Sequence, residues 1–314
     1  MKKRKLGKTN LLVSEIGFGC RSIGGKKPHE ANTIFSDISK ENAEQIIDFA
    51  IESGINTFDT SDSYSTGRSE IRLGESISKR RSDVYIFTKG GTEFLNETKT
   101  KSRTNLSPEY LLNSLNNSLK RLQTDYVDLF QTHGIPKLED VEGIITAFEK
   151  IKSENKARYC GISIGNAISR GLELIDYDFI DCIQISFSLI NRDALDELIP
   201  KCFKKGIGII VSRPLNEGFL SDFIIKKHFF DYDLRKTYSE DRLNNFQKKL
   251  DSLKFLQKLN LPLPKIAISY ILSNDMISTC IPSSNSIEQL SSNIQATNIE
   301  IDPELIKKIN SISN

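Results

Sequence analysis

Four side chains in this sequence could cooperate in transferring a proton to an oxygen atom. Asp59 lies in the run NTFDTS, Tyr64 follows it by five residues, Lys89 follows VYIFT, and His133 ends YVDLFQTH. A lysine ammonium close to a tyrosine hydroxyl stabilises the phenolate, so the tyrosine gives up its proton more readily. Asp59 could keep Lys89 charged, and His133 could bind the same substrate oxygen or relay a proton. Such a group suits a carbonyl oxygen that is becoming an alkoxide.

This chemistry needs a reductant, and protein side chains do not supply a hydride. A nicotinamide cofactor would supply it, and the protein would be responsible for positioning that cofactor. The four residues therefore predict reduction of an aldehyde or ketone to an alcohol, with Tyr64 as the general acid.

Two other motifs point to different chemistry. Gly161-Ile162-Ser163-Ile164-Gly165 matches the G-x-S-x-G elbow of serine hydrolases, whose histidine comes late in the chain, near the last strand. After Ser163 the only histidine is His228, well ahead of the last apolar run, so we disfavour a serine hydrolase. GFGCRS begins like a dinucleotide fingerprint but has Ser22 where the last glycine belongs, so a Rossmann fold is also disfavoured.

Eight short apolar runs alternate with longer helical patterns along the chain. The runs cover residues 15–20, 56–61, 84–91, 126–133, 157–164, 179–188, 206–214 and 276–284. Near-continuous apolar strands that are each followed by a helix are typical of a parallel sheet covered on its outer face. Eight such units in 314 residues predict an α/β fold of the (β/α)8 TIM-barrel type, with residues 1–314 forming a single domain.

Further elements should extend the predicted barrel. A hairpin within residues 4–14 would cover the bottom of the barrel, and residues 215–260 have room for a long loop and an added helix. Extra helices are expected near the C-terminus. Ser107-Pro108, preceded by Asn105, is typical of a helix start.

The predicted strands end in polar or charged residues. In such barrels the C-terminal ends of the strands converge on the open mouth, where the chemistry takes place. From the second strand to the eighth, the residues at these ends are Asp59, Lys89, His133, Ser163, Gln184, Arg213 and the pair Ser283-Ser284. A barrel without a functional site does not need this pattern.

Composition narrows the classes of partner. The formal charge of +2 gives no global attraction to nucleic acid or to an anionic membrane, and no run of about eighteen apolar residues would span a bilayer. The basic opening MKKRK is not followed by an apolar signal core. Five scattered cysteines indicate reduced thiols in the cytoplasm, and three histidines make a zinc site, or any metal centre, unexpected. The expected partner is a small carbonyl compound, and the oligomeric state stays open.

Segments spread along the chain closely resemble the aldo-keto reductase family. They are GINTFDTSDSYSTGRSEIRLGE (54–75), FTKGG (87–91), SLKRLQTDYVDLFQTH (118–133), ARYCGIS (157–163), IQISFSLINR (183–192), RPLNEGFL (213–220) and IPSSNSIEQLSSN (281–293). The resemblance covers nearly the whole chain, in order. It implies an (α/β)8 barrel that reduces carbonyl compounds with NADP(H) or NAD(H), and a catalytic tetrad formed by Asp59, Tyr64, Lys89 and His133.

The resemblance also implies a set of cofactor contacts. Ser163 and Gln184 fall where the family holds the nicotinamide carboxamide, and Leu215 and Gly218 fall in the loop that follows the pyrophosphate. Residues 283–293 correspond to the segment that receives the adenosine end. The full expected set is Gly19, Cys20, Arg21, Ser163, Gln184, Arg213, Pro214, Leu215, Gly218, Ser283, Ser284, Asn285, Gln289 and Asn293.

The sequence departs from the family pattern in ways that affect the cofactor. Ile164 stands where Asn usually follows the serine. VSRPL lacks the aromatic residue that in the family stacks on nicotinamide. Arg213 could stack there or bind phosphate, or it could merely pair with a loop carboxylate. IPSSNSIEQLSSN has no Lys or Arg to meet the 2′-phosphate of NADP, which predicts a weakened NADPH preference or acceptance of NADH.

The sequence leaves open an alternative function and the class of substrate. A barrel with an intact tetrad could instead serve as a redox-sensing regulatory protein that keeps its cofactor and turns over little, because fold does not fix function. Lys26, Lys27 and Arg68, near the predicted mouth, would suit a polar, sugar-like substrate.

Overall fold

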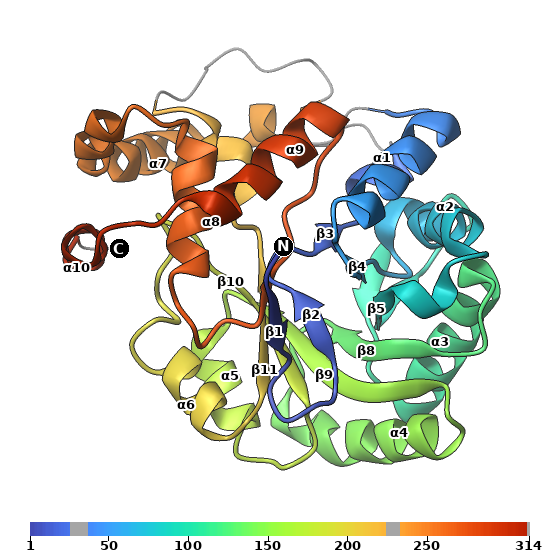
Figure 1. Ribbon diagram of the computed structural model, residues 1–314. Coiled ribbons are helices and arrows are strands. Elements are labelled where there is room, and N and C mark those ends of the chain that lie inside the picture. Colours follow the sequence, from blue (N-terminus) through green and yellow to red (C-terminus); the bar gives the residue numbers. More distant parts are fainter. Residues whose placement is uncertain (26–36, 224–232, 313–314) are drawn as a thin grey trace.

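Eight parallel strands form the centre of the molecule in the computed structural model, which describes residues 1–25, 37–223 and 233–312 (Figure 1). Each strand overlaps one of the eight predicted apolar runs, and neighbours in the sheet follow one another in chain order. The strands are β3 (Phe18–Gly19), β4 (Thr57–Asp59), β5 (Tyr85–Gly90), β8 (Val127–His133), β9 (Ala157–Gly165), β10 (Cys182–Ser186), β11 (Gly208–Ser212) and β12 (Thr279–Cys280).

The first and last strands meet and close the sheet. Ile16 and Cys280 form a parallel bridge. The N–H of Gly17 donates to the Cys280 carbonyl at 2.8 Å, and the Cys280 N–H donates to the Glu15 carbonyl at 3.0 Å. Because these bonds join the segment just before β3 to β12, the predicted (β/α)8 barrel is confirmed.

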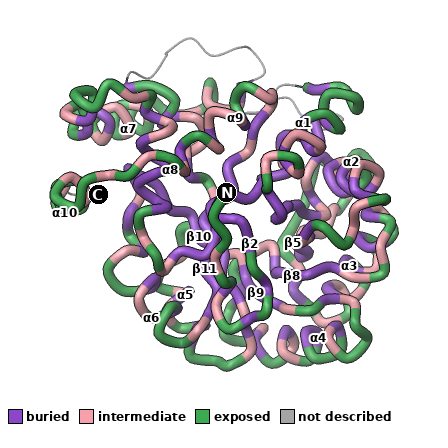
Figure 2. The backbone as a smooth tube through the Cα atoms, viewed as in Figure 1, coloured by how far each residue is buried: buried purple, intermediate pink, exposed green. Residues whose placement is uncertain are grey.

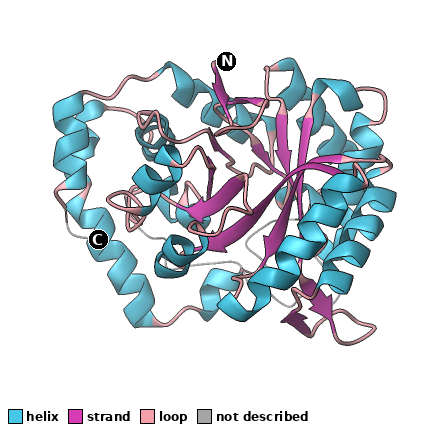
Figure 3. Ribbon diagram, turned by 90° about the horizontal axis from the view of Figure 1, so that it is seen from below, coloured by secondary structure: helices cyan, strands magenta, loops and turns pink. Residues whose placement is uncertain are grey.

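Helices surround the strands on the outside of the barrel (Figure 3). The buried residues gather at the centre, and the exposed ones lie on the outer helices and loops (Figure 2). The barrel helices are α1 (Lys40–Glu52), α2 (Arg68–Ile77), α3 (Pro108–Leu122), α4 (Val141–Ser153), α5 (Ile168–Leu174), α6 (Leu198–Lys204), α8 (Leu263–Leu272) and α9 (Ile287–Gln295). As predicted, α3 begins after Ser107, whose hydroxyl accepts from the Tyr110 N–H.

A hairpin covers the N-terminal end of the barrel, as the sequence predicts. Strands β1 (Lys3–Lys5) and β2 (Leu12–Ser14) pair antiparallel. Apolar residues of this hairpin form one buried cluster with residues that point into the barrel, namely Leu6, Leu11, Val13, Phe87, Leu129, Cys182, Ile210 and Ile281. The hairpin therefore closes the bottom, and the opposite end stays open for the site.

Other elements lie outside the eight repeating units. Two extra helices, α7 (Glu240–Ser252) and α10 (Pro303–Asn310), match the predicted additions before the last strand and near the C-terminus. An antiparallel pair, β6 (Thr92–Phe94) and β7 (Ser102–Thr104), follows β5 and was not predicted. Short 3-10 segments occupy Ser22–Gly24, Tyr64–Gly67, Arg81–Asp83, Leu138–Asp140, Asn216–Ser221, Leu234–Thr237, Lys254–Leu259 and Ala296–Asn298.

No helix within the described ranges has both the length and the apolar character needed to cross a membrane.

Candidate active site

The four predicted tetrad residues lie together at the open end of the barrel. Asp59 is the last residue of β4, Lys89 lies near the end of the neighbouring β5, and His133 is the last residue of β8. Tyr64 begins the 3-10 turn that follows β4. Because parallel strands end at the same edge of a sheet, side chains from distant parts of the sequence meet at the mouth.

Lys89 and Asp59 form a buried ion pair. The Lys89 ammonium donates to Oδ1 of Asp59 and to the Thr60 carbonyl, the latter at 2.8 Å, and each side chain is at most 2% exposed. Burial by itself lowers the pKa of Lys89, but the charge of Asp59 and the hydrogen bonds with Asp59 and Tyr64 outweigh it and raise the pKa above its ordinary value. The lysine is therefore held charged inside the barrel.

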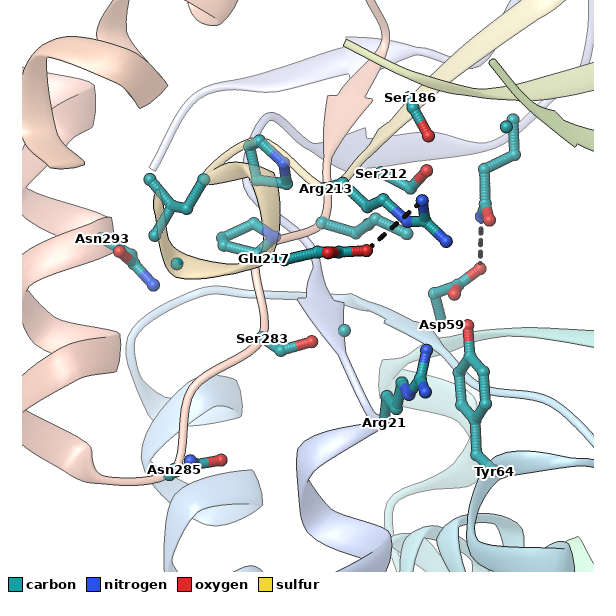
Figure 4. A pocket seen from close by; sticks show the side chains of 18 of the residues that line it. Arg21, Asp59, Tyr64, Ser186, Ser212, Arg213, Glu217, Ser283, Asn285 and Asn293 are labelled. Atoms are coloured by element: carbon teal, nitrogen blue, oxygen red, sulfur yellow. Dashed lines mark hydrogen bonds and ion pairs between the residues drawn. The ribbon is translucent and has the colours of Figure 1, made fainter. Parts of the chain in front are cut away.

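Tyr64 lies over this pair with its hydroxyl end directed toward Asp59 (Figure 4). The Lys89 ammonium is 5.2 Å from the centre of the Tyr64 ring, and the His133 ring meets it edge-on at 5.8 Å. The Arg21 guanidinium lies 5.7 Å from the same ring centre. A phenol hydroxyl thus stands next to a fixed positive charge and an imidazole.

Two serines that sequence reasoning missed hold the imidazole. Nδ1 of His133 is 2.8 Å from the Ser61 hydroxyl and 3.1 Å from the Ser63 hydroxyl. Both serines come from the segment TSDSY between Asp59 and Tyr64. Their closeness in sequence to two tetrad residues was the available signal.

The second carboxylate oxygen of Asp59 binds amides. Gln184 Nε2 donates to Asp59 Oδ2 at 2.8 Å, and Gln131 Nε2 approaches the same atom at 3.5 Å. The Ser163 hydroxyl in turn donates to Gln184 Oε1 at 3.1 Å. Ser163 and Gln184 therefore form one hydrogen-bonded chain that ends at the buried ion pair.

This arrangement does not support the serine-nucleophile motif. Ser163 lies inside β9, which runs on to Gly165, and not on a sharp turn into a helix. His133 is its register partner on β8, but the ring nitrogen Nδ1 faces Ser61 and Ser63. Ser163 therefore lacks the strained turn of a hydrolase nucleophile, and Nδ1 of His133 is bound by other serines.

A pocket of about 570 Å³ connects the tetrad to the start of α9. Figure 4 shows Asp59, Tyr64 and Arg21 toward one end, Asn285 and Asn293 toward the other, and Ser283 and Glu217 between them. The predicted site residues on its wall are Gly19, Arg21, Asp59, Tyr64, Lys89, His133, Ser163, Gln184, Arg213, Pro214, Leu215, Gly218, Ser283, Asn285, Gln289 and Asn293.

Cys20 and Ser284, also predicted as cofactor contacts, lie buried behind this wall. Burial raises the pKa of the Cys20 thiol well above its usual value. The Ser284 hydroxyl accepts from Asn293 Nδ2 at 3.0 Å, and its carbonyl accepts from the Ser22 hydroxyl at 2.8 Å. Both residues support the wall from behind and are not exposed on its surface.

The loop after β11 contributes the carboxylate of Glu217, which the sequence analysis did not single out as a site residue. Glu217 lies on the pocket wall, 3.6 Å from the Arg213 guanidinium, and its other oxygen accepts from the Tyr238 hydroxyl. Arg213 thus lies within ion-pair distance of a loop carboxylate, which is one of the alternatives that the sequence leaves open. Arg235, also on the wall, donates to the Glu217 carbonyl at 3.2 Å.

The far end of the pocket carries hydroxyls and amides. Between Ile281 and Asn293 the wall is formed by Ile281, Pro282, Ser283, Asn285, Gln289, Ser292 and Asn293, with no lysine or arginine among them. At Gly19 a Cβ atom would lie 2.7 Å from the Ser283 hydroxyl and 2.9 Å from the Ile281 carbonyl oxygen, so only glycine lets β3 approach the segment after β12 this closely. The pocket therefore has a charged centre at the tetrad end and neutral polar groups along residues 281–293.

Some sequence expectations fall elsewhere. Lys26 and Lys27 lie outside the described residues. Arg68 begins α2 and is not on the pocket wall. Within the described ranges, His, Cys, Asp and Glu form no group able to hold a metal ion.

Comparisons with known proteins define the class. The model of the aldo/keto reductase family matches residues 15–314, and the chain belongs to this family. An uncharacterized oxidoreductase of Bacillus subtilis, YqkF, is 32% identical over 302 residues, which cover 95% of this chain and 92% of that protein. The chain is therefore an oxidoreductase of the aldo-keto reductase type.

Two further proteins are similar to this chain over nearly its whole length. The NADH-specific methylglyoxal reductase of Escherichia coli is 28% identical over 96% of this chain and 95% of that protein. The holo form of the aldo-keto reductase AKR11C1 from Bacillus halodurans superposes with a TM-score of 0.80 at 31% identity, covering 99% of this chain and 95% of that one.

Proposed function

We propose that this protein reduces an aldehyde or ketone to an alcohol with NADH or NADPH, and that Tyr64 is the general acid. The observation that supports this most strongly is the buried Lys89–Asp59 pair beneath Tyr64 at the end of an elongated pocket. When bound, a nicotinamide cofactor supplies the hydride. The substrate carbonyl would lie between Tyr64 and His133, which approach each other edge-on.

Each tetrad member has a distinct role in this proposal. The Lys89 ammonium stabilises the negative charge that Tyr64 acquires as its proton passes to the substrate oxygen. Asp59 keeps that ammonium charged and fixed. His133, held by Ser61 and Ser63, orients the carbonyl through a hydrogen bond.

The remaining wall would hold the cofactor. Ser163 and Gln184, already joined to each other, would bind the carboxamide of the nicotinamide ring near Asp59. The loop with Leu215 and Gly218 would follow the pyrophosphate, and Ser283, Asn285 and Gln289 would face the adenosine end. These last residues are neutral, and a 2′-phosphate is strongly favoured only by cations.

We therefore expect NADH to be accepted. The similarity to the NADH-specific methylglyoxal reductase of Escherichia coli supports this preference. Initial rates with each cofactor, together with binding measured by the fluorescence of the reduced nicotinamide, test it. A kcat/KM at least as high with NADH is the expected result, and a hundredfold advantage for NADPH would contradict it.

Turnover separates an enzyme from a redox-sensing binder. A panel of short aldehydes such as methylglyoxal, of ketones and of open-chain sugars should reveal oxidation of NADH at 340 nm. Loss of activity in Lys89→Met, with Ser76→Ala on α2, away from the pocket wall, retaining turnover, would support the tetrad. Tight cofactor retention without turnover on any carbonyl would favour the regulatory role.

The proposal also covers location and organisation. All five cysteines are buried and free of disulfides, which is typical of a reducing compartment and supports a cytoplasmic protein. We treat residues 1–314 as one domain that acts on small carbonyl compounds.

A further inference from the structure

Asp62 lies beside the tetrad, and the proposed reduction does not use it. It follows β4 in the segment between Asp59 and Tyr64 and is partly buried. Its Oδ2 accepts from the Ser114 hydroxyl of α3 at 2.9 Å, and its Oδ1 accepts from the Ser61 hydroxyl at 3.1 Å. Its N–H donates to the Lys89 carbonyl at 3.1 Å, which fixes the backbone against β5.

The Ser61 hydroxyl connects this carboxyl group to the imidazole of His133. Its oxygen is 3.1 Å from Asp62 Oδ1 and 2.8 Å from His133 Nδ1. A hydroxyl has a single proton, so it can donate to only one of these two atoms. At 2.8 Å the serine and the ring nitrogen must share a hydrogen, and that hydrogen comes from whichever of the two is the donor.

The protonation state of Asp62 decides the direction of the hydrogen bonds from Asp62 through Ser61 to His133. An ionised Asp62 only accepts, so Ser61 donates to it and accepts a hydrogen bond from Nδ1–H of His133. A protonated Asp62 can donate to Ser61, whose own proton then points to a bare Nδ1. In a neutral imidazole the other nitrogen, Nε2, accepts in the first case and donates in the second.

We propose that Asp62 is a positioning residue that acts through Ser61 to set which ring nitrogen of His133 carries the proton. In the neutral ring, Nε2 donates a hydrogen bond when Asp62 is protonated and accepts one when Asp62 is ionised. The consequence for substrate binding rests on the proposed function, because a carbonyl oxygen can only accept. Ser63, at 3.1 Å from Nδ1 and 3.2 Å from the Ser61 hydroxyl, adapts its own proton to either state.

The burial of Asp62 and the charges around it place its ionisation near neutral pH. Burial and the nearby charge of Glu70 on α2 raise the pKa of Asp62 to about 7, against the hydrogen bonds from Ser114 and Ser61 and the charge of Arg121 on α3. Tyr110, also on α3, has a pKa raised to about 12 by burial and by Asp62, so it stays neutral. From β5, Lys89 faces Asp62 with its carbonyl while its ammonium binds Asp59.

The test is the tautomer of His133, followed by nitrogen NMR of protein labelled with ¹⁵N-histidine between pH 5.5 and 8.5. The chain has three histidines, and His133→Gln assigns the signal. In the wild type we expect the form protonated at Nδ1 to grow as pH rises through about 7. In Asp62→Asn, whose amide donates to Ser61 at every pH, the form protonated at Nε2 should persist throughout.

Two further variants should shift the pH midpoint of the His133 tautomer change in opposite directions. A nonspecific disturbance of the fold would not do this. Ser114→Ala removes a hydrogen bond to the carboxylate, so the midpoint should rise. Glu70→Gln removes a neighbouring negative charge, so the midpoint should fall. Ser76→Ala, whose hydroxyl binds only the Arg72 carbonyl of its own helix among the contacts described, is the matched control and should leave it unchanged.

A tautomer that does not change with pH in the wild type, or that changes equally in Asp62→Asn, would overturn the proposal. This readout needs neither cofactor nor substrate, so it fails or succeeds independently of the proposed reduction. Where turnover is present, KM for the carbonyl should rise by up to about tenfold per pH unit above the midpoint, because only the competent fraction binds. Asp62→Asn should remove this rise.

Discussion

At the scale of single residues, the site depends on a charge kept inside the barrel. Taking an ammonium group out of water is costly unless it is paired and hydrogen-bonded. Lys89 meets this condition through Asp59 and the Thr60 carbonyl, and Asp59 is in turn satisfied by Gln184. The same contacts that make the pair tolerable also fix the charge beneath Tyr64.

Asp62 provides a residue-scale prediction about stability and pH. Because folding raises the pKa of this carboxyl from 3.8 to about 7, the native state favours its protonated form, and stability is lost as pH rises from about 4 to 7. Asp62→Asn should therefore gain stability relative to the wild type by roughly 1–3 kcal/mol between pH 5 and pH 8. Urea unfolding at both pH values measures this, and an equal difference at both would contradict it.

The residues of the site differ in how far the sequence could predict them. Asp59, Lys89 and His133 end apolar runs, so barrel geometry alone brings them to the mouth. Ser61 and Ser63 carry no comparable pattern, because their role depends on the path of a turn. Whether an individual side chain such as Cys20 faces the pocket or the core also depends on that local path.

At the scale of elements, long buried strands were predictable and short exposed ones were not. β5, β8 and β9 are continuous apolar stretches and match their predicted runs closely. The pair β6–β7 is only partly buried or exposed and has no apolar alternation, so nothing in the sequence separates it from a loop. β3 and β12 are only two residues long, although hydrogen bonds continue beside them, from the Gly17 N–H to the Cys280 carbonyl and from the Ile281 N–H to the Val211 carbonyl.

The contact between α2 and α3 gives an element-scale prediction. A Cβ atom at Gly74 would lie 2.4 Å from the Leu122 carbonyl oxygen, which belongs to the backbone and cannot move aside. Gly74→Ala should lower the free energy of unfolding by roughly 1–3 kcal/mol, although alanine favours a helix elsewhere. Gly143→Ala in α4 is the control, since its nearest neighbours are Pro108 side-chain carbons at 3.2 Å. Equal effects in chemical denaturation would contradict this account of helix packing.

At the scale of the whole molecule, the N-terminal hairpin joins opposite ends of the chain. Arg4 on β1 donates to the carbonyls of Leu272, Asn274 and Ile277, the last two at 3.1 and 3.0 Å. Leu272 is the last residue of α8, and the other two carbonyls lie in its connection to β12. One side chain thus ties the bottom hairpin to the last barrel unit.

Removing that tie should weaken the entire barrel. Arg4→Met keeps the apolar stem but leaves the carbonyls without their charged donor, so we expect a loss of roughly 2–3 kcal/mol in one cooperative transition. Lys5→Met on the same strand, at an exposed position, should change stability by less than about 0.5 kcal/mol. Two separate transitions in either variant would contradict the single-domain prediction.

The central claim is that Tyr64 supplies the proton from its position over the Lys89–Asp59 pair. The most direct measurement compares kcat for a carbonyl that the wild type reduces with kcat for Tyr64→Phe, alongside the Kd of each protein for NADH from fluorescence titration. The account predicts a fall in kcat of about 10²–10⁴-fold with Kd changed by less than about twofold. A Tyr64→Phe protein that binds NADH normally and retains the wild-type kcat would contradict it.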